Sequence, residues 1–279
     1  MKSYKPTTQS RRNTLTINYR DILTTNDPEK SLTKGFRRGS GRNNAGRITT
    51  RHKGGGNKRL YRDIDFKYNK INIPAKISSI EYDPNRSAFI SVAVYADGEK
   101  RYVITPKSMK MGDSFIVSNE AKLTIGNRLQ LKYIPVGTFV YNIELKPSGG
   151  AKIARSAGNF AQVVANDEGY TNLKMPSGEI RKVSELCYAC IGEVSNEENK
   201  LKKYGKAGRS RWMGIRPTVR GSAMNPVDHP YGGGEGAQGR GTRRPKTMWG
   251  KVTGGRKTRT PKKYSNQFIV SRRKTGKKR

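Results

Sequence analysis

The residues best suited to chemistry lie close together near the C-terminal end of the chain, in residues 223–236 (AMNPVDHPYGGGEG). This stretch holds Asp228 and Glu235, the only two acidic residues of the last 79, and His229, one of the two histidines of the chain. Two prolines restrict the backbone around His229, and three consecutive glycines follow. An imidazole has an ordinary pKa of about 6.5, so a rigid turn that presents His229 could transfer a proton.

A structural role for the same turn is the alternative, and we favour it. His229 would then bind a phosphate or a base, and Asp228 would bind nearby backbone or a solvated cation. Ser222, Asp228 and His229 supply the residue types of a catalytic triad, but a triad needs a packed core to hold its geometry. The surrounding sequence predicts no such core, so we expect RNA contact and no enzymatic activity.

The two cysteines, Cys187 and Cys190, have the C-x₂-C spacing of many metal sites. Zinc needs two further ligands, and only His52 and His229, from opposite ends of the chain, could supply imidazoles. A redox role would place the pair at the start of a helix in a βαβ unit, which the sequence does not predict. We therefore expect two small core residues beside a strand, and no metal site.

Residues 54–58 (GGGNK) have some likeness to a phosphate-binding loop. They lack the spacing G-x-x-x-x-G-K-[ST], and no strand and helix flank them, so nucleotide hydrolysis is not predicted. A backbone cradle for nucleic-acid phosphates uses the same physics with fewer requirements, and this is the function that we expect.

Charge and composition limit the possible partners. The 279 residues include 57 basic and 21 acidic side chains, a net charge of +36, and only 33% of residues are hydrophobic. Such an excess requires a polyanion, with nucleic acid as the first candidate and an anionic membrane surface as the second. The longest apolar run, residues 186–191, is too short to span a membrane. Without a secretory signal or a disulfide framework, we expect a cytoplasmic protein.

The charge divides the chain into zones. Residues 61–200 have a net charge of +3, whereas residues 1–60 have +12 and residues 201–279 have +21. The middle alternates apolar and polar residues in short runs separated by turn residues, which predicts small β-barrels. We place the domain limits as a basic N-terminal extension at 1–60, one barrel at 61–128, a second barrel at 129–200, and a basic C-terminal extension at 201–279.

Individual strands can be predicted within the middle zone. Residues 89–95 and 101–105 flank Asp97-Gly98, the pattern of a hairpin with a type I′ turn. Residues 61–68 alternate and predict a strand with Arg62, Ile64, Phe66 and Tyr68 on one face. Further short strands are expected from residue 71 to residue 194, with Pro74 marking an edge or a bulge. One or two helical turns are expected at residues 197–203.

The two basic extensions are rich in glycine, arginine and lysine and cannot bury enough apolar area to order alone. Glycine allows close approach of the backbone, and the arginine fork matches phosphate oxygens, so we expect these segments to order against RNA. The aromatic residues Trp212, Tyr231 and Trp249 either stack on bases or anchor the tail to the barrels. The expected RNA-binding residues are Arg37, Arg38, Arg42, Arg47, Arg51, His52, Lys53, Lys58, Arg59, Arg209, Arg211, Trp212, Arg216, Arg220, Asn225, His229, Arg240, Arg243, Arg244, Lys246 and Trp249.

Three long motifs resemble the bacterial-type large-subunit ribosomal protein two family. They are residues 51–62 (RHKGGGNKRLYR), residues 205–221 (GKAGRSRWMGIRPTVRG) and residues 224–236 (MNPVDHPYGGGEG), and a basic tail at 268–273 follows. The resemblance implies an oligonucleotide-binding-type barrel at about 61–125 and an SH3-like barrel at about 130–200. It also implies extensions that enter large-subunit rRNA near the peptidyl-transferase region, and roles in subunit joining, tRNA binding and assembly of that region.

This sequence departs from the family pattern at two positions. Tyr231 stands where the family usually has a second histidine, which weakens any mechanism that needs two imidazoles, and Asn57 stands at a position that is commonly histidine. The histidine often discussed in the family corresponds to His229.

The sequence thus predicts an rRNA-binding structural protein of the large subunit. Its expected partners are large-subunit rRNA, neighbouring ribosomal proteins, the small subunit at the intersubunit face, and tRNA nearby. No cofactor is expected apart from magnesium or potassium ions bound to the RNA. An architectural DNA-binding protein is the alternative, although the chain offers no recognition helix for a major groove.

Overall fold

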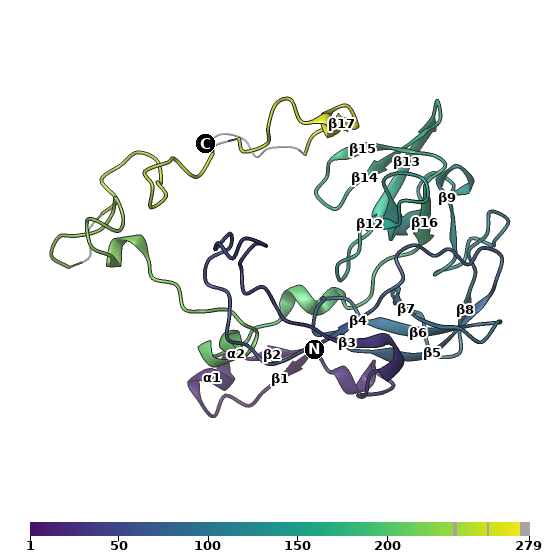
Figure 1. Ribbon diagram of the computed structural model, residues 1–279, viewed down its shortest axis with the longest axis horizontal. Helices are drawn as coiled ribbons and strands as arrows, with labels where there is room; N and C mark the ends of the chain where they lie inside the picture. Colours follow the sequence, from purple (N-terminus) through teal and green to yellow (C-terminus); the bar gives the residue numbers. More distant parts are fainter. Residues whose placement is uncertain (237–238, 256, 274–279) are drawn as a thin grey trace. The chain divides into compact units, whose positions relative to one another are not determined.

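Figure 1 shows the computed structural model, which describes residues 1–236, 239–255 and 257–273. The chain forms two compact units, each assembled from segments that are distant in sequence. The first unit comprises Met1–Arg37, Lys58–Gly205 and the segment from Gln267 onward, and the second comprises Arg38–Asn57 and Lys206–Asn266. Within the part of the chain that the structure describes, no helix combines the length and the apolar character needed to cross a bilayer.

The first unit is built mainly from β-strands, with an oligonucleotide-binding-type barrel followed by an SH3-like barrel. The first barrel contains an antiparallel sheet of four strands in the order β7-β6-β5-β8. Strand β5 begins directly after Pro74 and is an inner strand of the sheet. Its pairing with β6 is shifted by a bulge between Ile77 and Ser79, within the strand and not at the proline. The four strands are β5 (Ala75–Glu81), β6 (Ile90–Tyr95), β7 (Lys100–Ile104) and β8 (Ser114–Phe115).

The hairpin of β6 and β7 confirms the predicted strand pair but not the predicted turn. A type I′ turn requires positive φ at both central residues. Here Gly98 has φ of 82° and Asp97 is not in the left-handed region. The Gly98 amide donates to the Tyr95 carbonyl at 2.9 Å, and the Tyr95 amide donates to the Glu99 carbonyl at 3.0 Å. The connection is therefore a three-residue loop that ends in a left-handed glycine.

The predicted strand over residues 61–68 is only partly present. Strand β4 stops at Arg62, where its pairing with β3 ends at Thr33. Further along, Asp65 Oδ1 accepts hydrogen bonds from the amides of Lys67 and Tyr68, which turns the chain. Tyr68 itself has φ of 52°. The predicted face is nonetheless directed inward: Arg62, Ile64 and Tyr68 are buried, and Phe66 is half-buried. Side-chain alternation thus identified the core residues, although the backbone pairing ends early.

The second barrel contains a sheet of seven strands in the order β17-β15-β14-β13-β10-β16-β9. Its core is a cluster of buried aliphatic residues that includes Leu131, Val140 and Leu173. The last strand, β17, comes from the basic C-terminal tail and pairs antiparallel with β15. The strands are β9 (Arg128–Gln130), β10 (Phe139–Tyr141), β13 (Ala161–Asp167), β14 (Tyr170–Lys174), β15 (Ile180–Ser184), β16 (Tyr188–Ile191) and β17 (Ile269–Ser271).

Shorter elements complete the fold. The N-terminal segment contributes strands and places Ile17 in the first core at 4% exposure. The helical turns expected near residue 197 are present as the 3₁₀ segment η4 (Glu197–Leu201). The remaining elements are β1 (Lys2–Ser3), α1 (Gln9–Arg12), β2 (Leu15–Thr16), η1 (Tyr19–Asp21), η2 (Lys30–Leu32), β3 (Thr33–Gly35), β4 (Leu60–Arg62), η3 (Leu131–Tyr133), β11 (Ile143–Glu144), β12 (Ala151–Ile153), α2 (Ala207–Trp212), η5 (Gly221–Ala223) and η6 (Tyr264–Asn266).

A buried ion pair lies where the two cores meet. Arg128 and Glu144, each 1% exposed, are joined by a bond of 3.0 Å between Nη2 and Oε1. The Arg128 guanidinium also donates to the Asn142 carbonyl at 2.7 Å and lies 4.7 Å from the centroid of the Tyr68 ring. Tyr68 belongs to the first core and accepts a hydrogen bond from the Asn142 side chain. This one side chain therefore connects the hydrogen-bond networks of both barrels.

Candidate nucleic-acid interface

The two basic segments of the sequence are joined by backbone hydrogen bonds in the second unit. The Gly54 amide donates to the Gly214 carbonyl at 2.9 Å, and the Asn57 amide donates to the Trp212 carbonyl at 3.0 Å. In the opposite direction, the Arg216 amide donates to the carbonyl of His52 at 3.0 Å. These bonds connect residues about 160 positions apart, and we call the paired segments 52–57 and 212–216 the glycine ladder.

Close backbone approach explains the glycine at position 56. A Cβ atom there would lie 2.6 Å from the Gly214 nitrogen and 2.8 Å from the Trp212 carbonyl oxygen. Both neighbours are backbone atoms, which cannot rotate away as a flexible side chain could. The ladder therefore depends on the absence of a side chain at Gly56.

Arginine side chains surround the glycine ladder. Arg38 Nη2 donates to the Asn57 carbonyl at 3.1 Å. A Cβ on Gly55 would lie 3.7 Å from Arg211 Nη2, and one on Gly54 would lie 3.9 Å from Arg216 Cδ. No helix begins at this loop, because residues 52–57 continue in irregular structure. The arrangement is thus a glycine backbone bordered by guanidinium groups and differs from a nucleotide-hydrolysing loop.

We expect Gly56→Ala to separate the paired segments. Each of the three ladder bonds contributes about 1 kcal/mol net, so losing them should speed exchange of the Gly54, Asn57 and Arg216 amides by about 100-fold. Hydrogen exchange read by mass spectrometry, on the free chain and on its rRNA complex, measures this. Gly208→Ala is the matched control, because a Cβ at Gly208 meets nothing within 4 Å. Equal exchange in the two variants in both states would contradict the ladder.

The turn that carries His229 is packed around the imidazole. A Cβ on Gly221 would lie 2.5 Å from His229 Cε1, so the ring rests directly on that glycine. The Tyr231 amide donates to His229 Nδ1 at 3.1 Å, and the centroids of the His229 and Tyr231 rings are 5.0 Å apart. Because Nδ1 accepts this bond, the proton of the neutral ring is on Nε2. In a catalytic triad Nδ1 would instead carry a proton and donate it to the aspartate, so the turn is not arranged as a triad.

The three aromatic residues singled out in the basic tail have their contacts inside the second unit. Trp212 is 53% exposed, with Lys206 Nζ 5.0 Å from its ring centroid, and Trp249 is 69% exposed. The Tyr231 hydroxyl accepts a hydrogen bond from the amide of Lys246. Both tryptophans thus present ring area to solvent, whereas Tyr231 joins two loops.

The cysteines are core residues, as expected. Cys187 and Cys190 are free thiols, 0% and 1% exposed. Burial raises the pKa of Cys187 to about 12 and also raises that of Cys190, so both thiols stay protonated at neutral pH. Metal binding and nucleophilic attack require the thiolate. In the described ranges, no group of three or more histidine, cysteine or acidic residues could hold a metal ion.

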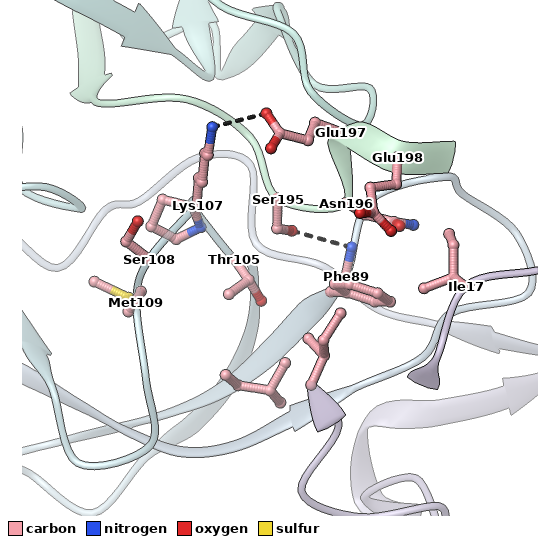
Figure 2. Close-up of a pocket in the computed structure, with 13 residues that line it drawn as sticks. Ile17, Phe89, Thr105, Lys107, Ser108, Met109, Ser195, Asn196, Glu197 and Glu198 are labelled. Carbon is pink, nitrogen blue, oxygen red and sulfur yellow. Dashed lines mark hydrogen bonds and ion pairs between the residues drawn. The ribbon is translucent and has the colours of Figure 1, made fainter. Parts of the chain in front are cut away.

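The first unit contains a pocket of about 270 Å³, which lacks the arginine-bordered glycine backbone of the second unit (Figure 2). Its lining is apolar around Ile17, Phe89 and Met109, with a polar rim. Lys107 Nζ is 2.7 Å from Glu197 Oε2, and the Phe89 amide donates to Ser195 Oγ at 3.3 Å. Other rim groups bond to residues outside the pocket, Asn196 Nδ2 to the Ser87 carbonyl and Glu198 to the Met1 amine, so most of the rim's polar groups already have partners within the protein.

Family models match most of the chain. Residues 29–118 match "Ribosomal Proteins L2, RNA binding N-terminal domain", and residues 124–250 match "Ribosomal Proteins L2, C-terminal domain". The chain belongs to the ribosomal protein L2 family. It is accordingly an RNA-binding structural protein of the large ribosomal subunit, located with the ribosome in the cytoplasm.

The two L2 domain models together cover both halves of the glycine ladder. The N-terminal model contains residues 52–57, and the C-terminal model contains residues 212–216 and the His229 turn. The family membership confirms the resemblance drawn from the three sequence motifs.

The structure places most of the expected RNA-binding residues of this L2 protein at the surface. Of the sixteen arginines and lysines named from sequence, Arg38, Arg59, Arg209 and Lys246 are half-buried and the other twelve are exposed. Three of the sixteen, Arg37, Lys58 and Arg59, belong to the first unit. His52, Trp212, Asn225, His229 and Trp249 lie with the remaining thirteen in the second unit.

Two arginines of the first unit that the sequence does not single out flank an aromatic ring, and one of them, Arg86, is paired with the buried Asp83 at 2.6 Å. Arg86 and Arg155 lie with their guanidinium carbons 5.7 Å and 4.4 Å from the centroid of the Phe66 ring. They come from separate turns of the near-neutral middle zone, so counting charge by segment could not detect them. The alternation that placed Phe66 toward the interior was the only signal at this position.

Proposed function

We propose that this L2 protein supports joining of the ribosomal subunits, binding of tRNA and assembly of the peptidyl-transferase region. The observation that carries the proposal is the second unit. It holds 20 basic and 2 acidic residues, a net charge of +18 in 81 residues, and its segments are held together by backbone bonds along glycines. Such a unit has little apolar core and a surface suited to the folded phosphate backbone of a large RNA.

The proposed contacts are those of the sixteen basic residues, of His52, Asn225 and His229, and of the two tryptophans. The proposed partners are large-subunit rRNA, neighbouring ribosomal proteins, the small subunit and nearby tRNA. No cofactor enters the proposal, and any magnesium or potassium ions would be held by the RNA.

For His229 we propose an RNA contact and no proton transfer. The ring rests on Gly221, and its Nδ1 accepts the Tyr231 amide, which leaves Nε2–H as a donor for a phosphate or base oxygen. Tyr231 also occupies the position where a second imidazole would be needed. These features fix the direction of one hydrogen-bond donor, which is what recognition of an RNA oxygen requires.

Reconstitution of large subunits tests both proposals. Particles assembled without this chain should be deficient in subunit joining, tRNA binding and peptide-bond formation, and the full chain should restore all three. His229→Ala particles that assemble should form peptide bonds at the wild-type rate. Val227→Ala is the matched control, because Val227 is in the same turn and 97% exposed.

Two results would overturn these proposals. General acid–base catalysis contributes about 10²–10⁴-fold, so a rate loss of that size in normally assembled His229→Ala particles would establish a chemical role. Particles that join small subunits, bind tRNA and form peptide bonds normally without the chain would remove the proposed function as a whole.

A further inference from the structure

Residues 245–253 form a tight hairpin with a tryptophan in its loop. The Thr253 amide donates to the Pro245 carbonyl at 2.7 Å, and the Thr247 amide donates to the Lys251 carbonyl at 2.8 Å. The Gly250 amide closes the turn on the Thr247 carbonyl at 2.9 Å, and Gly250 has φ of 74°. This geometry of three loop residues ending in a left-handed glycine holds Met248 and Trp249 at the tip.

The Trp249 ring at this tip is exposed but not without a neighbour. Its side chain is 69% exposed, although the Arg51 guanidinium carbon lies 5.5 Å from the ring centroid. Arg51 Nη1 also donates to Met248 Sδ at 2.9 Å. The guanidinium is therefore held beside the indole by two contacts, and most of the aromatic surface remains available to another molecule.

The hairpin is anchored to the His229 turn through Tyr231. The Lys246 amide donates to the Tyr231 hydroxyl, which in turn lies 3.3 Å from Thr242 Oγ1 and 3.4 Å from the Arg244 carbonyl. The Tyr231 ring rests beside His229. The position of Trp249 is thus fixed from within the unit, which lowers the entropy cost of binding a ligand on its face.

We propose that Trp249, Arg51 and Met248 form a stacking site for one unpaired nucleobase of rRNA. The proposal rests on the proposed function and adds to it a contact with a base, of any sequence, beside the contacts with phosphates. Every aromatic face suits a planar base, and guanidinium groups stack on bases as well. Lys246 and Lys251 in the hairpin supply cations for the flanking phosphates. An apolar protein partner would require apolar neighbours around the ring, whereas this hairpin is surrounded by basic residues.

Single-tryptophan variants of the full chain test the site by fluorescence. Trp212→Phe leaves Trp249 as the only tryptophan of the chain, and Trp249→Phe leaves Trp212. Selective excitation of tryptophan avoids emission from the tyrosines. The probes are an oligoadenylate of about 12 nucleotides, within the usual length for single-strand binding, and an abasic oligonucleotide of equal length and charge. Oligoadenylate should quench Trp249 emission at saturation, and the abasic probe should not.

Affinity measurements provide the second readout. Trp249→Leu should weaken oligoadenylate binding by about 5- to 150-fold, the equivalent of ~1–3 kcal/mol per stacked base, and should leave abasic binding unchanged. Trp249→Tyr keeps an aromatic face and should retain most of the affinity. Circular dichroism checks that each variant is folded.

Three results would overturn the stacking site. The first is equal quenching by both probes, and the second is a Trp249→Leu variant that binds oligoadenylate as tightly as the wild-type chain does. The third is quenching that occurs only when other ribosomal proteins are added. In each case binding of rRNA by the chain would persist. Loss of rRNA binding by the wild-type chain would instead indicate failure of the proposed function, so the two failures are distinguishable.

Discussion

Replacing Arg128 with methionine should lower the free energy of unfolding by about 3–5 kcal/mol, because it leaves Glu144 as an unpaired charge in the interior. Both side chains are 1% exposed, and Glu144 would keep only the Tyr188 amide, which donates to Oε2 at 3.2 Å. The variant also removes the donor to the Asn142 carbonyl and the cation beside Tyr68. Urea denaturation followed by far-UV circular dichroism measures the loss. Tryptophan fluorescence would not report on it, because both tryptophans lie in the second unit and the ion pair lies in the first.

Two further variants make this result interpretable. Arg47→Met removes an exposed arginine and should change the unfolding free energy by no more than about 0.5 kcal/mol. The double variant Arg128→Met/Glu144→Leu removes both buried charges and should recover a large part of the loss. A single variant as stable as the Arg47→Met control would show that the ion pair does not hold the two cores together.

Affinity for large-subunit rRNA should fall steeply with salt. If ten cations of the basic tail meet phosphates, the slope of log K against log salt is about −7 to −9, and raising salt from 50 to 200 mM costs about 10⁴- to 10⁵-fold in affinity. Filter binding of the full chain over this range measures the slope. A value near −2 would mean that most of these cations contact no phosphate.

Charge variants locate the contribution of the second unit to that slope. Replacing Arg240, Arg243 and Arg244 with glutamine should reduce its magnitude by about 2–3. The matched control replaces three exposed lysines of the first unit, Lys146, Lys152 and Lys174, and should leave it nearly unchanged. A duplex DNA competitor at equal salt should displace the chain poorly, as expected of a protein that recognises folded RNA.

Most of the barrels could be predicted from sequence because burial in a strand repeats every second residue. That period identified the inward side chains of residues 61–68 even though strand β4 stops at Arg62. It could not identify the turn at Asp65, where a carboxylate captures two backbone amides. The same period could not show that Arg128 is buried. The cost of burying its charge is offset by Glu144 and Tyr68, and these residues come next to Arg128 only in the folded chain.

The residue types of the interface were predictable, but their arrangement was not. Glycine and arginine enrichment identified both basic segments, whereas the pairing of residues 52–57 with residues 212–216 has no local signal. The glycine at position 56 is required by contact with Gly214 and Trp212, and sequence spacing carries no information on partners so distant. Likewise, the sequence predicts a basic extension that includes the tail residues 268–273, yet Ile269 and Val270 lie in a strand of the second sheet.

The position of β17 at the edge of the second sheet has a consequence for synthesis of the protein. The other six strands are complete in the nascent chain once Ile191 has emerged, but β17 ends at Ser271, eighty residues later. Throughout that interval the outer edge of β15 has no partner strand from its own chain. Open strand edges are most prone to pair with other chains at this stage. The cationic segment that is translated in between repels the same segment of other nascent chains. This repulsion keeps neighbouring unfinished copies apart until β17 joins the sheet.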